Sequence, residues 1–462
     1  MPTVAIVGGG ASGTLLAAHL VRAGGSRVVL IERGERVGRG VAYGTSFAGH
    51  LLNVPAASLT ALPGDPEHFL RHARAHHDPG TAPTTFVPRS VYGAYLEHVL
   101  SESGRSAAPG ALLVRRRREV VAIAPGREDG RWLMTFADGG RLHADRIVLA
   151  LGNLPPRDPP LAAGSWPRDP ARYISDPWRA GALAGRAPGT VLAIGTGLTM
   201  VDVALELRAH TPGQRIVALS RGGLFPHAHR VGGAPPSRNV PIPAPTPSLT
   251  SLLRSVRRAA AVAEIGGGDW RDAVNALRPV TSELWAGLPE SEQRRFAHRL
   301  ARYWDVHRHR LAPNVATAIE TLRADGALQF VRGRIGAVAE TPSGLDVSLQ
   351  VHGSDRTRAL RVGAIVNCTG PTGDVRSGGS RLLEALCASG VVRPHPLALG
   401  LDTRAGGALV DAEGREHDTL FTLGPLRRGE LWETTAIPEI RAQAQALAHR
   451  LAGTRVLAAA RG

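Results

Sequence analysis

The first 32 residues of the chain constrain its fold more than any other stretch. An apolar run over residues 4–7 ends in the spacing Gly8-x-Gly10-x-x-Gly13. An alanine- and leucine-rich segment with helical periodicity follows, and a second apolar run closes on Glu32. This order predicts a strand, a glycine turn, a helix and a parallel strand with an acid at its tip. Such a unit binds a dinucleotide, and it predicts an α/β fold with a Rossmann-like parallel sheet.

Each residue type in this motif has a physical role. Gly8 permits a sharp turn, and Gly10 lacks a Cβ, so the main chain can approach a pyrophosphate. Gly13 lets the helix pack closely on the strand. The helix N-terminus offers unpaired N–H groups and about half a positive charge. Glu32 can accept hydrogen bonds from both ribose hydroxyls and would repel a 2′-phosphate.

The same plan returns in the middle of the chain. A buried-strand pattern over residues 190–194 leads into Gly195-x-Gly197-x-x-Met200, a helical segment and a second apolar run at 216–219. We therefore expect two Rossmann-like domains. Because Met200 replaces the third glycine, either the second helix lies farther from its strand or the methionine side chain fills the gap.

The second copy also differs at the tip of its second strand. That strand ends in Ser220-Arg221, where the first copy has Glu32. Losing a carboxylate and gaining a guanidinium favours a ribose that carries a 2′-phosphate. We expect NADPH at this site in preference to NADH; the alternative is that Arg221 is only a surface charge.

The two copies predict how the domains divide. Residues 1–160 form the first part of the N-terminal dinucleotide-binding domain, and residues 364–462 form its second part. Residues 186–363 form the other dinucleotide-binding domain, with a helical insertion over 246–312. The N-terminal domain is therefore expected to be discontinuous in sequence.

Short alternating apolar segments predict β-meanders within both domains. In the first, they are Leu112–Val114, Val120–Ile123 and Trp132–Phe136, which we interpret as hairpins. In the second, residues 325–362 have the same pattern. A proline-rich stretch from Pro155 to about Pro188 predicts a linker between the domains.

Charge and composition exclude several function classes. The formal net charge is +16, but the sequence contains no lysine, so all 55 basic residues are arginine. With abundant Ala, Gly and Pro, this pattern is typical of codon bias rather than of a polyanion-binding surface, and we expect no nucleic-acid partner. The missing lysine also excludes Schiff-base chemistry.

The apolar runs and the cysteines limit which compartment and which redox chemistry the sequence is compatible with. No apolar run is long enough to cross a membrane, and the N-terminus has no signal-peptide pattern, so we expect a cytoplasmic protein without a membrane partner. The two cysteines, Cys368 and Cys387, lie far apart in sequence. With no Cys-x-x-Cys pair, a redox-active dithiol relay is excluded.

Several further motifs carry a resemblance to a known family. The sequence resembles the flavoproteins with two dinucleotide-binding domains, and within them the poorly characterised FAD/NAD(P)-binding oxidoreductases related to flavin monooxygenases. The resemblance covers nearly the whole chain. Its motifs are Gly40-Val41-Ala42-Tyr43-Gly44-Thr45, His50-Leu51-Leu52-Asn53-Val54-Pro55, residues 304–313 (WDVHRHRLAP), residues 423–429 (LGPLRRG) and residues 431–441 (LWETTAIPEIR).

The resemblance implies FAD at the N-terminal glycine motif and NAD(P)H at the central one. It also implies that the last helix, which begins near Thr435, points its N-terminus at the flavin, and that Gly424 passes close to the FAD. The residues expected to bind the cofactors are Gly8, Gly10, Ala11, Ser12, Gly13, Glu32, Arg33, Leu52, Asn53, Gly152, Gly195, Gly197, Thr199, Met200, Ser220, Arg221, Gly424, Trp432, Thr435 and Ala436.

Asn53 is the candidate catalytic residue. Its segment resembles the asparagine-containing stretch beside the flavin in flavin monooxygenases, where a neutral amide can both donate and accept hydrogen bonds. The alternative is an asparagine in an ordinary loop turn. Two histidine pairs, His227 with His229 and His307 with His309, lack an accompanying acid cluster. We expect no metal there.

These observations predict an FAD-dependent, NAD(P)H-oxidising enzyme of the monooxygenase type. NADPH would reduce FAD, and the reduced flavin would react with oxygen to hydroxylate a small molecule. Two alternatives stay open: a flavin reductase or dehydrogenase with another acceptor, and a non-catalytic nucleotide-binding sensor.

Overall fold

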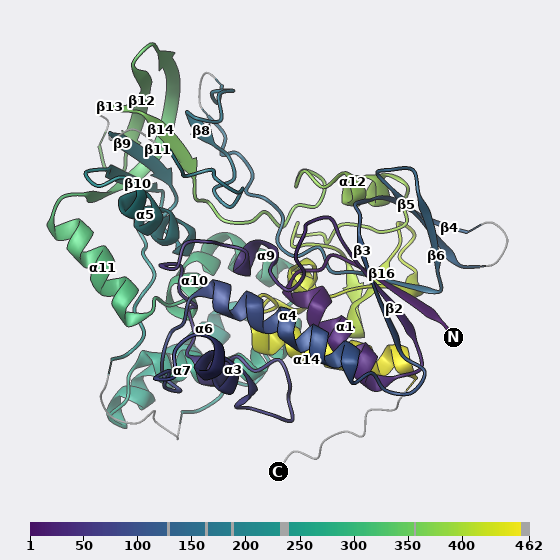
Figure 1. Cartoon of the computed structure of the whole chain (residues 1–462). Coiled ribbons are helices and arrows are strands. Elements are labelled where there is room, and N and C mark those ends of the chain that lie inside the picture. Colours follow the sequence, from purple (N-terminus) through teal and green to yellow (C-terminus); the bar gives the residue numbers. More distant parts are fainter. Residues whose placement is uncertain (127–129, 162–164, 186–188, 232–239, 355–356, 454–462) are drawn as a thin grey trace. The chain divides into compact units, whose positions relative to one another are not determined.

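The computed structural model describes residues 1–126, 130–161, 165–185, 189–231, 240–354 and 357–453. The chain separates into two compact units, each with its own sheet and helices (Figure 1). The first unit comprises Met1–Ser46, Val54–Leu154 and the chain from Gly373 onward. The second comprises Phe47–Asn53 and Pro155–Thr372.

The first unit is built on a seven-stranded sheet with the order β15-β16-β17-β7-β1-β2-β3. Its core strands β17, β7, β1, β2 and β3 run parallel, and β15 and β16 add an antiparallel edge. All five residues of β1 are buried, as a parallel strand covered on both faces requires. The strands are β1 (Thr3–Val7), β2 (Arg27–Glu32), β3 (Leu112–Arg117), β7 (Arg146–Leu149), β15 (Thr403–Arg404), β16 (Ala408–Val410) and β17 (Glu416–Thr422).

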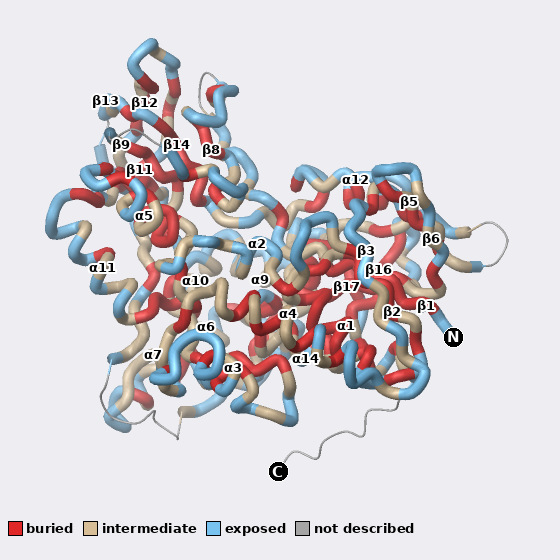
Figure 2. Tube along the Cα trace, in the orientation of Figure 1, coloured by how far each residue is buried: buried red, intermediate tan, exposed pale blue. Residues whose placement is uncertain are grey.

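In the first unit, α1 packs against both α4 and α14 (Figure 1). Figure 2 shows that the central strands β1 and β2 and most of α1 are buried. The helices are α1 (Ala11–Ala23), α2 (Gly40–Tyr43), α3 (His68–His76), α4 (Arg89–Arg105), α12 (Arg381–Ala388), α13 (Arg428–Leu431) and α14 (Ile437–Ala452).

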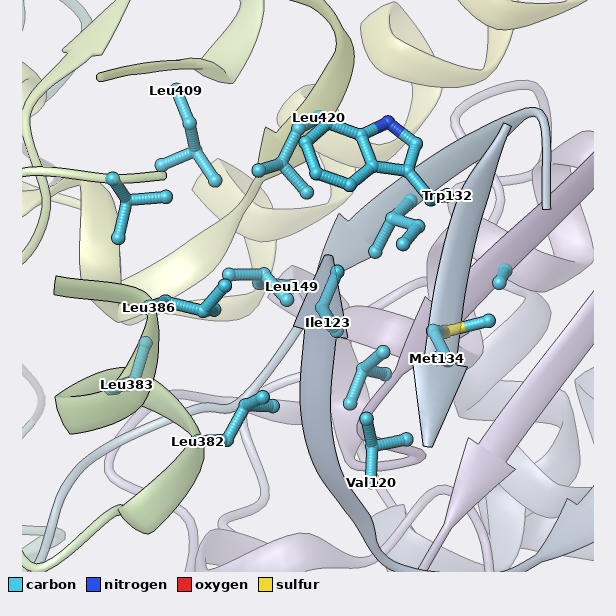
Figure 3. Close-up of a cluster of buried hydrophobic side chains, with 14 of the residues drawn as sticks. Val120, Ile123, Trp132, Met134, Leu149, Leu382, Leu383, Leu386, Leu409 and Leu420 are labelled. Atoms are coloured by element: carbon cyan, nitrogen blue, oxygen red, sulfur yellow. The ribbon is translucent and has the colours of Figure 1, made fainter. Parts of the chain in front are cut away.

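A separate three-stranded meander, β4-β5-β6, covers part of the sheet. It consists of β4 (Val120–Pro125), β5 (Trp132–Phe136) and β6 (Arg141–Ala144). Trp132, Met134 and Phe136 alternate with more exposed residues, so β5 buries one face. Those side chains pack with Leu149 of the sheet and with leucines of α12 (Figure 3). Trp132 Nε1 also donates a hydrogen bond to Thr419 Oγ1 of β17 at 2.9 Å.

The segment at 112–117 corrects the expectation of a hairpin. It forms β3, which pairs in parallel with β2 over residues 27–32 and belongs to the main sheet. The next strand, β4, pairs antiparallel with β5 in the separate meander. Local alternation cannot tell a parallel edge strand from a hairpin strand, because both have one covered face.

The second unit repeats this architecture. Its seven-stranded sheet has the order β13-β12-β11-β10-β9-β14-β8, with β9, β10, β14, β8 and the first part of β11 in parallel. β11, β12 and β13 form an antiparallel meander, as the sequence indicates. The strands are β8 (Tyr173–Ile174), β9 (Thr190–Ile194), β10 (Arg215–Ser220), β11 (Leu328–Thr341), β12 (Gly344–Val351), β13 (Thr357–Val362) and β14 (Ala364–Asn367).

Helices of the second unit include α5, which follows its glycine turn, and a run of helices between β10 and β11. All of this run except its last helix, α11, lies within the predicted insertion over 246–312, which is helical as expected. The helices are α5 (Leu198–His210), α6 (Leu249–Ile265), α7 (Trp270–Leu277), α8 (Thr281–Ala286), α9 (Glu290–Arg299), α10 (Ala301–Arg308) and α11 (Pro313–Ala324). The two-domain α/β architecture thus has the form that the repeated glycine motifs predict.

The boundaries of the compact units differ from the predicted domain boundaries in three places. Residues 155–185 belong to the second unit because β8 pairs with β14 at the edge of its sheet. Residues 364–372 belong there because β14 pairs with β9. The short segment 47–53 also belongs to the second unit, although the chain on both sides of it is in the first.

Candidate dinucleotide-binding sites

The first glycine of each motif has the same backbone geometry. Gly8 has a φ of 107° and Gly195 a φ of 112°, a region that side chains disfavour. A Cβ on Gly8 would lie 2.3 Å from the carbonyl oxygen of Ala150, and one on Gly195 would lie 2.3 Å from that of Cys368. Only glycine fits either position. The two turns therefore have the same backbone conformation and the same requirement for glycine.

The helix after each turn begins without a side-chain cap. Gly10 is the N-cap residue of α1 and Gly197 that of α5, and both have extended backbone angles. No side chain accepts a hydrogen bond at either cap, and neither first turn contains an acid. The first N–H groups of α1, around Ala11 and Ser12, and those of α5, around Thr199, can thus bind phosphate oxygens.

The third motif position separates the two copies. A Cβ on Gly13 would lie 1.9 Å from the carbonyl oxygen of Gly8, so α1 packs on its turn at the closest possible distance. Met200 has the equivalent position in α5 and is completely buried in the apolar core of the second unit. Because a side chain must fit there, α5 cannot approach its turn as closely as α1 does.

Glu32 is held at the tip of β2 by backbone donors. Its Oε2 accepts the N–H of Gly9 at 2.7 Å, and its Oε1 accepts the N–H of Gly34 at 2.7 Å. A Cβ on Gly9 would lie 2.8 Å from Glu32 Cβ, so this glycine makes room for the acid. The motif spacing does not single out Gly9. Arg33 points outward, with its side chain 78% exposed and 3.9 Å from Glu119.

Thr14 links the glycine turn to the segment that follows β2. Its Oγ1 donates to the carbonyl of Gly9 at 3.0 Å and accepts the N–H of Gly38 at 3.0 Å. Gly40 lies beside the turn, with its Cα 3.6 Å from where a Cβ on Gly10 would stand. The motif that begins at Gly40 is thus anchored next to the nucleotide turn. Sequence spacing alone does not reveal this contact.

The C-terminal glycine predicted to pass the cofactor lies against α1. Gly424 has a φ of 78°, and a Cβ there would be 2.7 Å from Ser12 Oγ. Its N–H donates to Gln443 Oε1 at 2.9 Å, and its carbonyl accepts the hydroxyl of Thr434. Two side chains therefore fix this loop: Gln443 within α14 and Thr434 just before that helix. Neither was a predicted site residue.

Trp432 is buried and has a φ of 59°, an unusual conformation for a residue with a side chain. The Arg428 guanidinium lies 4.4 Å from the centre of its ring. The helix α14 then begins at Ile437, with Ala436 as N-cap and proline in its first turn. Thr435 is exposed and one position outside the helix, so it does not cap it. The first N–H groups of α14 have no side-chain acceptor at the cap.

Residues after β10 make a short turn at the predicted 2′-phosphate position. Ser220 Oγ accepts the N–H of Gly223 at 3.0 Å, and Arg221 is exposed. Arg332 of β11 is the strand partner of Ser220. Its Nε lies 3.5 Å from the carbonyl oxygen of Arg221, at the limit of a hydrogen bond.

A third guanidinium side chain reaches the same turn. Arg302 of α10 has its Cδ 3.8 Å from where a Cβ on Gly222 would stand. Within the described ranges, Arg221, Arg302 and Arg332 form no ion pair with a carboxylate, whereas many other arginines of this chain do. The turn therefore presents uncompensated positive charge.

The candidate catalytic segment is tied to the second unit. His50 is buried, and its Nε2 lies 3.1 Å from the carbonyl oxygen of Asp202 in α5. His229 Nε2 lies 2.8 Å from the carbonyl oxygen of Asn53. Burial lowers the pKa of His229 to about 4, so the ring is neutral at pH 7 and donates this hydrogen bond.

Around this segment, Leu52 is buried and Asn53 is half-buried. The Asn53 side-chain amide has no hydrogen-bond partner in the described part of the protein. Gly152, another predicted contact, has a φ of 69° and follows the end of β7 in the first unit.

The histidines that are close in sequence do not share one site; instead, one histidine from each pair contacts the other pair's member. The rings of His227 and His307 are 4.7 Å apart, and both contact the ring of Trp270, at 5.1 and 4.8 Å. His229 instead contacts Asn53. Among the described residues, no group of three or more His, Cys, Asp or Glu is arranged to hold a metal ion.

Residues 5–154 match the sequence profile of a family described as FAD-NAD(P)-binding. They therefore form an FAD/NAD(P)-binding domain, as the N-terminal motif predicts. No curated protein sequence matches the chain. Among the helices that the structure describes, none has the length and apolar character needed to cross a membrane.

Solved structures with the same fold span the whole chain. Ornithine hydroxylase from Pseudomonas aeruginosa, in its reduced form, is 16% identical with a TM-score of 0.64, and the match covers 98% of this chain and 99% of that one. L-lysine 6-monooxygenase from Pseudomonas syringae is 17% identical with a TM-score of 0.61, covering 98% of each chain. A cadaverine monooxygenase from Erwinia amylovora, bound to FAD, is 12% identical with a TM-score of 0.61, covering 99% and 97%. The resemblance to two-domain flavoproteins related to flavin monooxygenases is thereby confirmed at the level of the fold.

Proposed function

We propose that this protein is an FAD-dependent, NADPH-oxidising monooxygenase that hydroxylates a small molecule. With both cofactors bound, FAD would take a hydride from NADPH and pass the electrons to oxygen. The observation that carries the proposal is the repetition of one nucleotide turn in two units, with an acid at the strand tip in the first and arginines in the second.

In the first unit, the residues present fit FAD. The uncapped N-terminus of α1 offers N–H groups to a pyrophosphate, and the Gly8 turn leaves no Cβ in the way. Glu32 keeps lone pairs for ribose hydroxyls while its backbone contacts fix its position. The uncapped start of α14 supplies a second set of N–H groups, whose partial positive charge would favour a reduced, anionic ring.

In the second unit, the residues favour NADPH. The N-terminus of α5 has the same uncapped form for the pyrophosphate. At the tip of β10, Ser220 and Arg221 take the place of an acid, and Arg332 and Arg302 add guanidinium groups to the same turn. A guanidinium binds phosphate oxygens through parallel N–H donors, which a ribose without a 2′-phosphate cannot use.

Asn53 is the proposed residue at the reacting centre. Its amide is neutral, can donate and accept, and makes no hydrogen bond to the described residues. The contact of its carbonyl with His229 fixes the backbone and leaves the side chain available. An amide in this role would orient the nicotinamide or a flavin-bound group through hydrogen bonds.

Oxygen is the proposed acceptor, and a small amine is the proposed class of substrate. The thiol of Cys368 is buried, and burial raises its pKa far above the usual range, so it does not act as a redox thiolate. Structures with the same fold include enzymes named for hydroxylation of ornithine, lysine and cadaverine, and this likeness supports the assignment by analogy.

The test uses the purified, FAD-loaded protein. We expect a flavin spectrum, bleaching by NADPH without oxygen, and rapid recovery of the spectrum when oxygen is added. NADPH oxidation should accelerate in air, and candidate amines should yield hydroxylated products. Oxidation of NADPH that is no faster in air than under argon would reject oxygen as acceptor and favour a reductase. Absence of bound flavin would favour a nucleotide sensor.

A further inference from the structure

Arg310 lies just after α10 and is buried, with only 5% of its surface exposed. Its Nη2 donates a hydrogen bond to Asn275 Oδ1 of α7. Its Nε is also buried but has no hydrogen-bond partner among the residues that the structure describes. A guanidinium stays protonated in proteins, so a charged donor is left unsatisfied inside the second unit.

The acids nearest to this arginine are already paired with other arginines. Arg230 donates to Asp269 at 2.9 Å and to Asp272 at 3.0 Å. Arg271 donates to Asp269 at 3.1 Å. Among the described residues, neither acid forms an ion pair with Arg310, and Arg308 adds a further positive charge nearby.

These surroundings change the pKa of Arg310. The pKa of Arg310 is lowered to about 10, mainly by burial and also by the neighbouring charges of Arg308 and Arg271, while Asp269 opposes the shift. Burying a cation without a counter-ion is costly, because desolvation is not offset by a partner. Beside Arg310, Leu311 forms a β-bridge with Ala228, which ties residues 227–229 to this part of the chain.

We infer that the Arg310 region is a binding site for an oxyanion of a small molecule, either a carboxylate or a phosphate. The unpartnered Nε–H points to an acceptor that the protein itself does not supply. A guanidinium edge matches two oxygens held in one plane, and its charge-assisted hydrogen bonds are stronger than neutral ones. Asn275 holds the other end of the group and so orients it before the ligand arrives.

The site is linked to the proposed reacting centre through one backbone segment. Arg271 Nε donates to the carbonyl of Ala228 at 3.0 Å, and the next residue, His229, contacts Asn53 at 2.8 Å. On the proposed function, the oxyanion would therefore be the acidic end of the molecule that is hydroxylated near Asn53. This second part of the inference rests on that function; the oxyanion site itself does not.

The test is an anion titration of the FAD-loaded full-length protein without NADPH, at fixed ionic strength set with chloride. The probes are succinate and inorganic phosphate. Trp270 reports on the site, because its ring lies 6.0 Å from the Arg310 guanidinium and 4.5 Å from that of Arg271. The Trp270→Phe variant identifies its share of the fluorescence, since the chain has seven tryptophans.

We expect at least one probe to give a saturable fluorescence change, and Arg310→Met to weaken its binding at least about tenfold, as loss of a charge-assisted contact predicts. Arg258→Met, which removes an exposed arginine of α6, is the matched control and should bind like the wild type. Arg310→Lys keeps the charge but not the planar fork, so it should also bind more weakly, and it serves if the methionine variant does not fold.

A wild-type protein that responds to neither probe would overturn the inference, and so would equal binding by the wild type and the Arg310 variants. A response to succinate alone assigns a carboxylate site, and one to phosphate alone assigns a phosphate site. The titration needs no turnover, so it would still test the oxyanion site if the monooxygenase proposal failed.

Discussion

Single residues decide what each nucleotide turn can accept. Gly8 and Gly195 make the same turn with nearly equal φ angles, so the turn itself does not distinguish the two sites. The distinction lies at the strand tips, where Glu32 is fixed by two backbone donors and Arg221 stands beside Arg332. On the proposed function, charge at this one position, rather than the shape of the turn, would carry the specificity for the ribose.

Replacing Arg221 with alanine should weaken the binding of NADPH far more than the binding of NADH. Loss of charge-assisted contacts to a 2′-phosphate should raise the KM for NADPH about tenfold to a hundredfold and leave that for NADH almost unchanged. Steady-state NADPH and NADH oxidation would measure both. Arg358→Ala, an exposed arginine of β13, is the control. Equal losses for the two nucleotides would contradict a 2′-phosphate role.

Replacing Glu32 with glutamine should release FAD and weaken the first unit. The amide would present a donor to one of the two N–H groups that Glu32 now accepts, at a cost of about 1–3 kcal/mol in unfolding free energy. Flavin retained after gel filtration and a chemical unfolding curve would show both effects. Glu35→Gln, at an exposed position three residues on, should change neither.

At the scale of elements, three helix starts belong to the proposed cofactor sites. The N-termini of α1, α5 and α14 all lack a side-chain cap. A helix end without a cap leaves N–H groups for a ligand, at some loss of helix stability. The start of α14 is brought toward α1 by contacts with the Gly424 loop, so this arrangement depends on packing between elements far apart in the sequence.

The Gly424 loop should loosen when its two side-chain contacts are removed. Thr434→Val and Gln443→Leu each leave a buried backbone group of Gly424 unsatisfied, which should cost about 1–3 kcal/mol and lower FAD retention. Thermal unfolding with and without added FAD would measure it. Gln445→Leu, on a more exposed position of the same helix, is the control. Unchanged FAD retention in both variants would argue against a cofactor role for the loop.

For the whole molecule, three partly buried histidines couple folding to pH. Burial is the main cause that lowers the pKa values of His19, His72 and His229 to about 4, from about 6.5 in an unfolded chain. They lie on α1, on α3 and in the second unit. The unfolded chain therefore binds more protons than the folded protein between these two pH values.

Stability should accordingly be highest above pH 6.5 and should fall as the pH drops toward 4. Each histidine can contribute at most about 1.4 kcal/mol per pH unit in this window, and less where solvent reaches it. Urea unfolding at pH 7, 6 and 5 would measure the slope. His229→Gln should flatten it, and a variant with the wild-type slope would show that His229 does not carry this dependence.

The local sequence pattern was sufficient to predict the two glycine turns and the strands and helices beside them. The steric demand for glycine at Gly8 and Gly195, and the apolar periodicity around them, act over a few residues and leave their signature in the sequence. The helical insertion and the second meander could be predicted for the same reason. The strand at 112–117 could not, because its place in the sheet depends on which hydrogen-bonding edge it meets.

The remaining features arise from contacts between distant parts of the chain. Gly424 lies against Ser12, and Asn53 is held by His229, although hundreds of residues separate the members of the first pair and more than a hundred those of the second. The position of Arg332 beside Arg221 and the burial of Arg310 have the same origin. The glycine turns thus predict two nucleotide sites from local sterics alone, whereas the proposed ribose and oxyanion contacts depend on long-range packing, which no short stretch of sequence records.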